Sequence, residues 1–141
     1  MALKRREERE ILFTMLFEAL FHPEREPREL FDAILENADR DDLAQSAYLR
    51  EGFLGVCTHR EEIMASIAAS AKGWRPERLS KVSLALLQLA VYEMTFVPDL
   101  AKEVAINEAV ELSKKYDDDK APAFINGVLR GVFNALPKDL A

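Results

Sequence analysis

Apolar residues recur every three or four positions along most of the chain, with charged and amide residues between them. This spacing places them on one face of an α-helix, and no segment of useful length alternates between apolar and polar residues as a half-buried strand would. In the stretch FINGVLRGVFNAL the apolar positions fall at 124/125, 128/129, 132/133 and 136. The pattern predicts an all-α protein.

About seven helices are expected, bounded by prolines, glycines and acidic segments. Their approximate ranges are 4–21, 27–35, 42–56, 63–71, 82–94, 102–116 and 122–136. At 141 residues and 49% hydrophobic composition, the chain is long enough for one domain with a compact core. We expect two packed helical sub-bundles in that domain, of about 1–72 and 73–141, with Trp74 and Leu79 packed between them.

Two glycines, Gly127 and Gly131, interrupt the last expected helix. A glycine inside a helix costs roughly 0.5–1 kcal/mol relative to alanine. Because the two glycines lie four positions apart, they share a helix face. Either another helix or a ligand is expected to approach this face closely. The two can coexist, since Asn126 at its edge can both donate and accept hydrogen bonds.

The first expected helix is apolar around most of its circumference, more than one core-facing stripe needs. Either this helix is central in a bundle, or it buries one face and offers another to a partner protein. Its apolar residues are Ile11, Leu12, Phe13, Met15, Leu16, Phe17, Ala19, Leu20 and Phe21.

The same helix begins with a cluster of cations, Lys4, Arg5, Arg6 and Arg9. The helix dipole disfavours cations at this end by some tenths of a kcal/mol each. One interpretation is a solvated charged face, softened by the local pairs Lys4–Glu8 and Arg6–Glu10. The other is an arginine cluster that binds phosphates, because a bound anion would reverse the sign of this penalty.

The composition narrows the function classes. The net charge of −6, from 25 acidic and 19 basic residues, argues against capture of duplex DNA by a basic domain, but it leaves room for a local basic patch. The single cysteine, Cys57, cannot form an internal disulfide, which favours a reducing cytoplasm. No apolar run of about 18–20 residues and no signal peptide is present, so no membrane role is expected.

Residues that could indicate catalysis or metal binding have simpler interpretations. The run Asp117-Asp118-Asp119 lacks the spaced ligands of a calcium loop and is expected to cap a helix or form a solvated turn. His22 and His59 have no neighbours at metal-ligand spacing, and Cys57 lies among apolar helical residues. No catalytic residue, metal or cofactor is expected.

Four segments together resemble the NusB family of bacterial transcription antitermination factors. They are RREEREILFTMLFE at 5–18, GWRPERLSKVSLALLQLAVYEM at 73–94, VAINEAVELSKKY at 104–116 and FINGVL at 124–129. Their order and spacing extend the resemblance over nearly the whole chain.

The resemblance implies a cytoplasmic RNA-binding factor without catalytic activity. Such a factor pairs with a small ribosomal protein that also acts as the antitermination factor NusE. The pair binds the single-stranded boxA element of ribosomal RNA leader transcripts and helps to keep RNA polymerase resistant to termination, with NusA and NusG taking part. Some family members self-associate through the face that would carry RNA, so a homodimer is a further expectation.

The resemblance also nominates residues. Phe17, Ser83 and Leu87 correspond to the face that binds the ribosomal protein. The residues that correspond to RNA contacts are Lys4, Arg5, Arg6, Arg9, Lys115, Lys120, Phe124 and Asn126.

The sequence departs from the family pattern at several positions. Ser83 stands where a charged residue is usual, and Leu84 and Gln88 stand near the usual place of arginines, so we expect a polar contact with the partner to be altered or lost. Asp117 follows Tyr116 where glycine is common, so the usual left-handed helix cap is not expected here. Two alternative functions stay open: the RNA-binding module of a ribosomal-RNA cytosine methyltransferase, and a helical adaptor that does not bind RNA.

Overall fold

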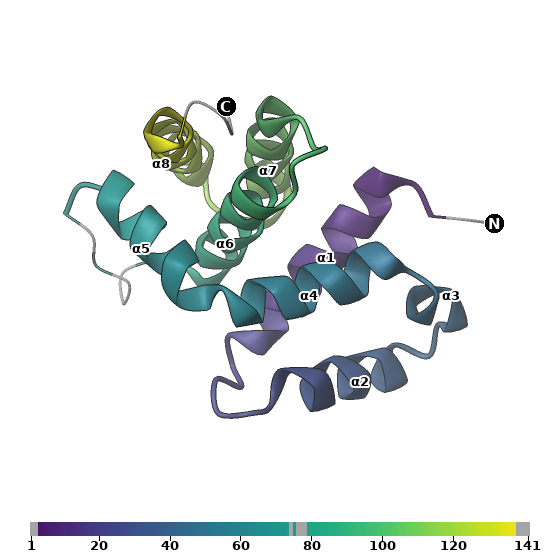
Figure 1. Cartoon of the computed structure of the whole chain (residues 1–141). Helices are drawn as coiled ribbons and strands as arrows, with labels where there is room; N and C mark the ends of the chain where they lie inside the picture. The colour runs from purple at the N-terminus through teal and green to yellow at the C-terminus, as the bar shows by residue number, and fades with distance from the viewer. Residues whose placement is uncertain (1–2, 74, 76–78, 138–141) are drawn as a thin grey trace.

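The computed structural model describes residues 3–73, 75 and 79–137, and in these residues it contains helices and no strands (Figure 1). The all-α prediction is confirmed, but the described residues form eight helices rather than seven. They are α1 (Arg5–Ala19), α2 (Pro27–Ala38), α3 (Asp41–Ala44), α4 (Ala47–Thr58), α5 (Arg60–Ser70), α6 (Lys81–Phe96), α7 (Lys102–Tyr116) and α8 (Ala121–Ala135).

The extra helix arises because the segment expected as one helix over 42–56 is divided into α3 and α4. Ser46 has extended backbone angles, and its hydroxyl accepts a hydrogen bond from the Leu49 backbone N–H at 3.1 Å. A serine in this position caps the start of a new helix. The expected single helix was therefore wrong, although the capping serine was visible in the sequence.

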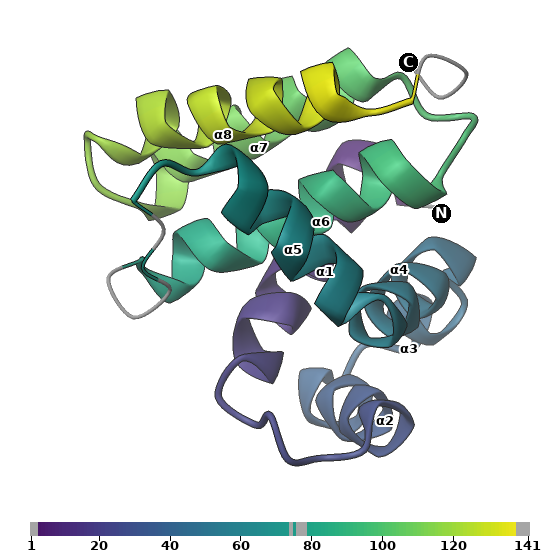
Figure 2. The same ribbon diagram turned by 60° about the vertical axis from the view of Figure 1, so that its left-hand side comes forward.

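The central helix of the molecule is α6. It packs against α1, α4, α5, α7 and α8 (Figure 2). Ten of its sixteen residues are buried, so the helix is surrounded on most of its circumference. The central position that the sequence offered to the first helix thus belongs to α6, and α1 retains a partly exposed apolar face.

The remaining helices pack on either side of α6. On one side α1, α2 and α4 contact one another, and α2 lies at the end of the molecule far from α8 in both views (Figures 1 and 2). On the other side α7 packs along α8, while α5 packs against α6 and α8. The division near residue 72 stays a prediction, and α5, which that division assigns to the first half, makes most of its contacts in the second. Leu79 packs against the core, whereas Trp74 lies outside the described residues.

The glycines have different explanations. Gly73, just after the end of α5, has a φ of +65°, a left-handed conformation that glycine adopts readily at helix ends. A Cβ atom on Gly131 would come within 3.0 Å of the Ser70 Cβ, so α5 and α8 approach closely there. A Cβ atom on Gly127 would meet nothing within 4 Å. Close helix packing therefore explains Gly131 and does not explain Gly127.

None of the helices in the described part of the chain combines the length and the hydrophobicity needed to cross a membrane.

Candidate nucleic-acid interface

The basic start of the chain forms the first turn of α1. Arg5 and Arg6 are exposed, and each guanidinium donates from Nε to a carboxylate: Arg5 to Glu8 at 3.2 Å and Arg6 to Glu108 at 3.0 Å. The Arg5 guanidinium also lies over the Tyr48 ring, 4.2 Å from its centroid. Two guanidiniums therefore reach the surface at this end of α1, alongside the exposed Lys4.

Arg9 does not reach the surface, which corrects the expectation that it contacts RNA. Its side chain is 4% exposed, and its Nε donates to Glu93 Oε1 at 3.0 Å. Burial by itself would lower the pKa of Arg9, but the hydrogen bond and the negative charge of Glu93 outweigh it and raise the pKa. The Tyr48 hydroxyl also donates to Glu93, at 3.0 Å. Arg9 therefore links α1 to α6 inside the core, and Glu93 in turn links α6 to Tyr48 on α4.

Lys115, at the end of α7, is bound to α1. Its Nζ donates to Glu10 Oε2 at 2.6 Å, and the Tyr116 hydroxyl donates to the same oxygen. These hydrogen bonds, the one from Lys115 first, hold the pKa of Glu10 below its usual value. The helix-internal pair expected between Arg6 and Glu10 is thus replaced by two contacts between α1 and α7.

Arg6 and Asn126 come together in one groove, although they lie near opposite ends of the chain. The groove, called the Arg6 groove below, has a volume of about 490 Å³ between α1, α7 and α8. Its lining residues are Arg6, Val104, Asn107, Glu108, Val110, Glu111, Lys114 and Asn126. The basic start and the glycine-containing last helix therefore share a surface.

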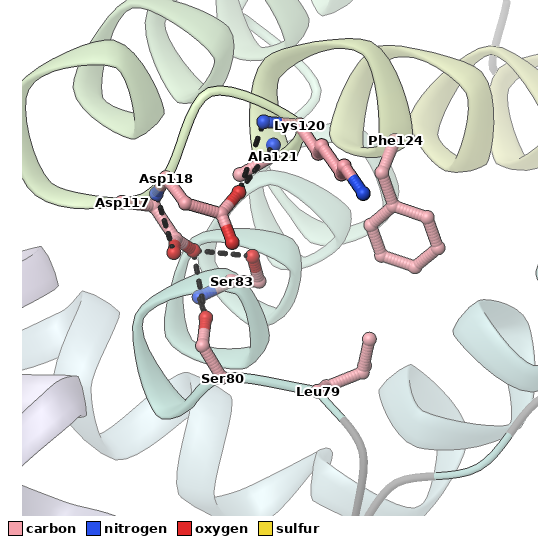
Figure 3. A pocket seen from close by; sticks show the side chains of 8 residues that line it. All are labelled: Leu79, Ser80, Ser83, Asp117, Asp118, Lys120, Ala121 and Phe124. Carbon is pink, nitrogen blue, oxygen red and sulfur yellow. Dashed lines mark hydrogen bonds between the residues drawn. The ribbon is translucent and has the colours of Figure 1, made fainter.

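Lys120 and Phe124 line a second opening, of about 450 Å³, called the Phe124 pocket below (Figure 3). The Phe124 ring is 36% exposed, and Figure 3 shows the Lys120 side chain extending toward it. The pocket is lined by Leu79, Ser80, Ser83, Asp117, Asp118, Lys120, Ala121 and Phe124.

The two openings contain four of the expected RNA contacts, Arg6 and Asn126 in one and Lys120 and Phe124 in the other. Phe124 and Asn126 are two positions apart on α8, and two residues of an α-helix are separated by about 200° around its axis. They therefore face different openings, whereas Lys4, Arg5, Arg9 and Lys115 line neither of the two. Helix α7 connects these openings, since Lys114 lines the Arg6 groove and Asp117, directly after the helix, lines the Phe124 pocket.

Two departures from the family pattern, Ser83 and Asp117, contact each other in the Phe124 pocket. Asp117 has extended backbone angles, φ −125° and ψ −176°, so α7 does not end in a left-handed cap. Its Oδ2 accepts hydrogen bonds from Ser83 Oγ at 2.6 Å and from Ser80 Oγ at 2.7 Å (Figure 3). Partial burial alone would raise the pKa of Asp117, but these hydrogen bonds outweigh it and lower the pKa.

Asp118 caps the start of α8. Its Oδ1 accepts hydrogen bonds from the backbone N–H groups of Lys120 and Ala121, each at 3.0 Å. This is the geometry of an aspartate at a helix N-terminus, where the first N–H groups have no partner within the helix. The helix-capping interpretation of the aspartate run is therefore supported for Asp118.

The three residues nominated for the protein partner differ in their exposure. Phe17 is half-buried in a row of rings, 6.4 Å from Phe13 and 5.3 Å from Phe21 between centroids. Ser83 is 5% exposed and Leu87 is fully buried, so neither side chain is available for contact. The expectation for Ser83 and Leu87 is corrected, because the Ser83 hydroxyl binds Asp117 and the Leu87 side chain packs in the core.

The surface beside Phe17 is completed by residues that the sequence did not nominate. Phe21 is 54% exposed, and the Lys81 ammonium lies 5.3 Å from the centroid of its ring. Leu84, one turn after Lys81 on α6, is half-buried. The i,i+3 spacing of Lys81 and Leu84 was the available signal that they share a helix face.

Known proteins share the sequence pattern and the fold of this chain. The model of the NusB family matches residues 6–134. The transcription antitermination protein NusB of Limosilactobacillus fermentum is 42% identical over 130 residues, which cover 92% of each chain. The solved structure of T. maritima NusB has a TM-score of 0.85 at 28% identity and covers 99% of this chain and 98% of its own.

A second solved structure, described as the antitermination factors NusB and NusE in complex with dsRNA, has a TM-score of 0.77 at 28% identity. It covers 94% of this chain and 97% of the matched chain. With a family model that spans most of the sequence and a relative of this identity and coverage, the chain belongs to the NusB family.

Proposed function

We propose that this protein is an RNA-binding transcription antitermination factor. With a small ribosomal protein acting as NusE, it binds the boxA element of ribosomal RNA leader transcripts and supports processive transcription by RNA polymerase, with NusA and NusG. It does so in the bacterial cytoplasm, where transcription takes place, and without catalysis. The observation that carries this proposal is the meeting of Arg6 and Asn126 in one groove.

The two openings match the chemistry of unpaired RNA. Single-stranded RNA is held by cations along its phosphates and by aromatic rings and amides on its exposed bases. The Arg6 groove offers the Arg6 guanidinium, the Lys114 ammonium and the Asn126 amide. The Phe124 pocket offers a part-exposed ring beside the Lys120 ammonium. A strand that follows α7 from one opening to the other would meet phosphate and base contacts in turn.

We expect this chain to bind RNA with modest affinity on its own. About four phosphate contacts give a slope near −3 for the logarithm of the binding constant against the logarithm of the salt concentration. The net charge of −6 opposes the approach of RNA at long range. A ribosomal protein that adds its own cationic surface would raise the affinity, so we expect the two proteins to bind RNA cooperatively.

The partner surface in this proposal is the row of rings on α1 together with the start of α6. Phe17 and Phe21 supply an exposed apolar contact, and Lys81 and Leu84 lie next to it. Aromatic residues are enriched at the centres of protein interfaces. The solved complex that contains NusB and NusE, which has the same fold, supports a partner of this kind.

Titration of a fluorescent single-stranded boxA-like RNA tests the proposal. The protein, Arg6→Ala, Phe124→Ala and the control Arg28→Ala, which changes an exposed arginine on the distant α2, are compared with and without the ribosomal protein. We expect weaker binding by the first two variants, unchanged binding by the control, and tighter binding when the partner is present. Unchanged binding by Arg6→Ala and Phe124→Ala, with helical circular dichroism, would mean that RNA is not bound at this surface.

A further inference from the structure

The ion pair between Arg6 and Glu108 is asymmetric. The Arg6 side chain is 79% exposed, whereas the Glu108 side chain is 14% exposed, and the closest atoms are Nε and Oε1 at 3.0 Å. Glu108 lies in the middle of α7, which packs against both α6 and α8. The carboxylate is therefore the fixed member of the pair, and the guanidinium is the member that solvent or a ligand can reach.

The contact uses one edge of the guanidinium. An arginine side chain carries five N–H donors in a planar fork. The Nε edge of Arg6 is directed to Glu108, and within residues 3–73, 75 and 79–137 neither Nη atom donates to a protein acceptor. Arg6 lines the same groove as Asn126. The Nη donors of Arg6 are therefore available at the expected RNA surface.

The other carboxylate of the groove, Glu111, behaves differently. It pairs with Lys114 on its own helix at 3.5 Å, and both side chains are more than half exposed. Such a pair is weak and is readily exchanged for solvent or for another ion. Glu111 therefore adds negative charge to the groove without fixing the orientation of a cation.

We infer that Glu108 is a positioning residue for RNA binding: it holds the guanidinium of Arg6 so that its Nη edge is presented to a phosphate in the groove shared with Asn126. The inference rests on the proposed function and names a specific role within it. Without Glu108, Arg6 would be a free side chain at an exposed helix start, and binding would have to order it. Ordering a long side chain weakens binding by about two- to tenfold.

Glu108 could have the opposite role, in which its carboxylate competes with RNA phosphates for the Arg6 guanidinium. Any carboxylate near a phosphate site can act in this way. The two roles predict changes of opposite sign. Removal of a competitor tightens RNA binding, whereas removal of a positioning residue weakens it in spite of the lost negative charge. Glu111→Ala removes a negative charge from the same groove, one helical turn away, without breaking a contact to Arg6.

The experiment is a titration of a single-stranded boxA-like RNA with the full chain and the variants Glu108→Ala, Glu108→Gln, Glu111→Ala, Arg6→Ala and Arg6→Ala/Glu108→Ala, each checked by circular dichroism. We expect Glu108→Ala to bind about two- to tenfold more weakly and Glu111→Ala to bind equally or slightly more tightly. Glu108→Gln keeps an acceptor for Nε and should restore the affinity. In the Arg6→Ala background, Glu108→Ala should cause no further weakening.

Equal or tighter binding by Glu108→Ala, matching Glu111→Ala, would overturn the inference while leaving the proposed function intact, provided that Arg6→Ala still weakens binding. If Arg6→Ala binds RNA as tightly as the unchanged protein, the proposed RNA surface itself is wrong. Should Glu108→Ala fail to fold, Arg6→Lys decides the question. Lysine keeps the charge but has no Nη edge that could face a phosphate while another edge binds Glu108. Arg6→Lys should therefore bind RNA as weakly as Arg6→Ala, and full affinity would overturn the inference.

Discussion

The guanidinium of Arg9 and the carboxylate of Glu93 lie against each other inside the protein, 84 positions apart in the chain. Both side chains are at most 4% exposed, and the Tyr48 hydroxyl supplies a third member of the network. A buried charge is tolerated only when it is paired and hydrogen-bonded, so these residues must remain together for the helices that carry them to pack.

Removal of one member should destabilise the protein strongly. Arg9→Ala leaves the Glu93 carboxylate buried without its cation, and breaking a buried pair in this way costs about 3–5 kcal/mol. Urea unfolding followed by circular dichroism measures the change. The exposed Arg6→Ala is the control and should change the free energy of unfolding by less than about 1 kcal/mol. Similar losses for the two variants would mean that the Arg9 pair is not buried as described.

Neutralisation of Glu10 should strengthen RNA binding. Glu10→Gln releases the Lys115 ammonium, which, unlike the guanidinium of Arg6, is a compact charge that needs no orientation. Exposed ion pairs are worth about 0.2–1 kcal/mol, so the affinity for single-stranded RNA should rise by up to about fivefold at low salt. Glu62→Gln, on α5, removes the same charge from an exposed site that does not contact Lys115. Equal effects of the two variants would show that Glu10 does not restrain Lys115.

The hydrogen bonds from Ser80 and Ser83 to Asp117 predict a pH dependence of stability. The pKa of Asp117 in the folded protein lies below that of the unfolded chain, so the unfolded chain binds more protons in the acid range. The contribution of Asp117 is therefore present above its unfolded pKa of about 3.9 and is lost as the pH falls through the folded value.

Asp117→Asn should accordingly be less stable than the unchanged protein at about pH 6 and should approach it in stability near pH 3. Urea unfolding at a series of pH values measures this convergence. A stability difference that stayed constant across the acid range would contradict the assignment.

The two glycines of α8 should respond differently to alanine. Gly127→Ala adds a methyl group where nothing lies within 4 Å, so it should stabilise the protein by about 0.5–1 kcal/mol. Gly131→Ala brings the new Cβ to 3.0 Å from Ser70, so this gain should be reduced or lost. Thermal unfolding measures both. If RNA passes over Gly127, the same alanine should weaken RNA binding, and equal thermal gains for the two variants would contradict the packing described for Gly131.

The helical fold could be predicted from the sequence because the apolar spacing and the boundary residues of each helix lie within a short segment. The apolar period gave α7 its observed bounds, and Pro27 marked the start of α2 because proline suits a first helical turn. Ser46 was overlooked because the apolar period continues through it, although its side chain caps α4. Sequence spacing alone thus predicts where helices form better than where one helix gives way to the next.

The candidate site could be predicted only in part, because its partners are distant in the chain. Arg6 and Asn126 were placed on one surface correctly, while Arg9 was grouped with its exposed neighbours. Glu93 and Glu108 gave no local signal, since each meets its arginine across more than 80 positions. A single sequence does not show which charges a fold will bury together.

The most direct test of the central claim is an NMR titration of the ¹⁵N-labelled 16.0 kDa protein with a short single-stranded boxA-like RNA. Amide shifts should concentrate at residues 5–6, at the end of α7 and over 118–127, where the Arg6 groove and the Phe124 pocket lie. Shifts that cluster instead on α2 and α5, with none at these positions, would contradict the assignment of this surface to RNA.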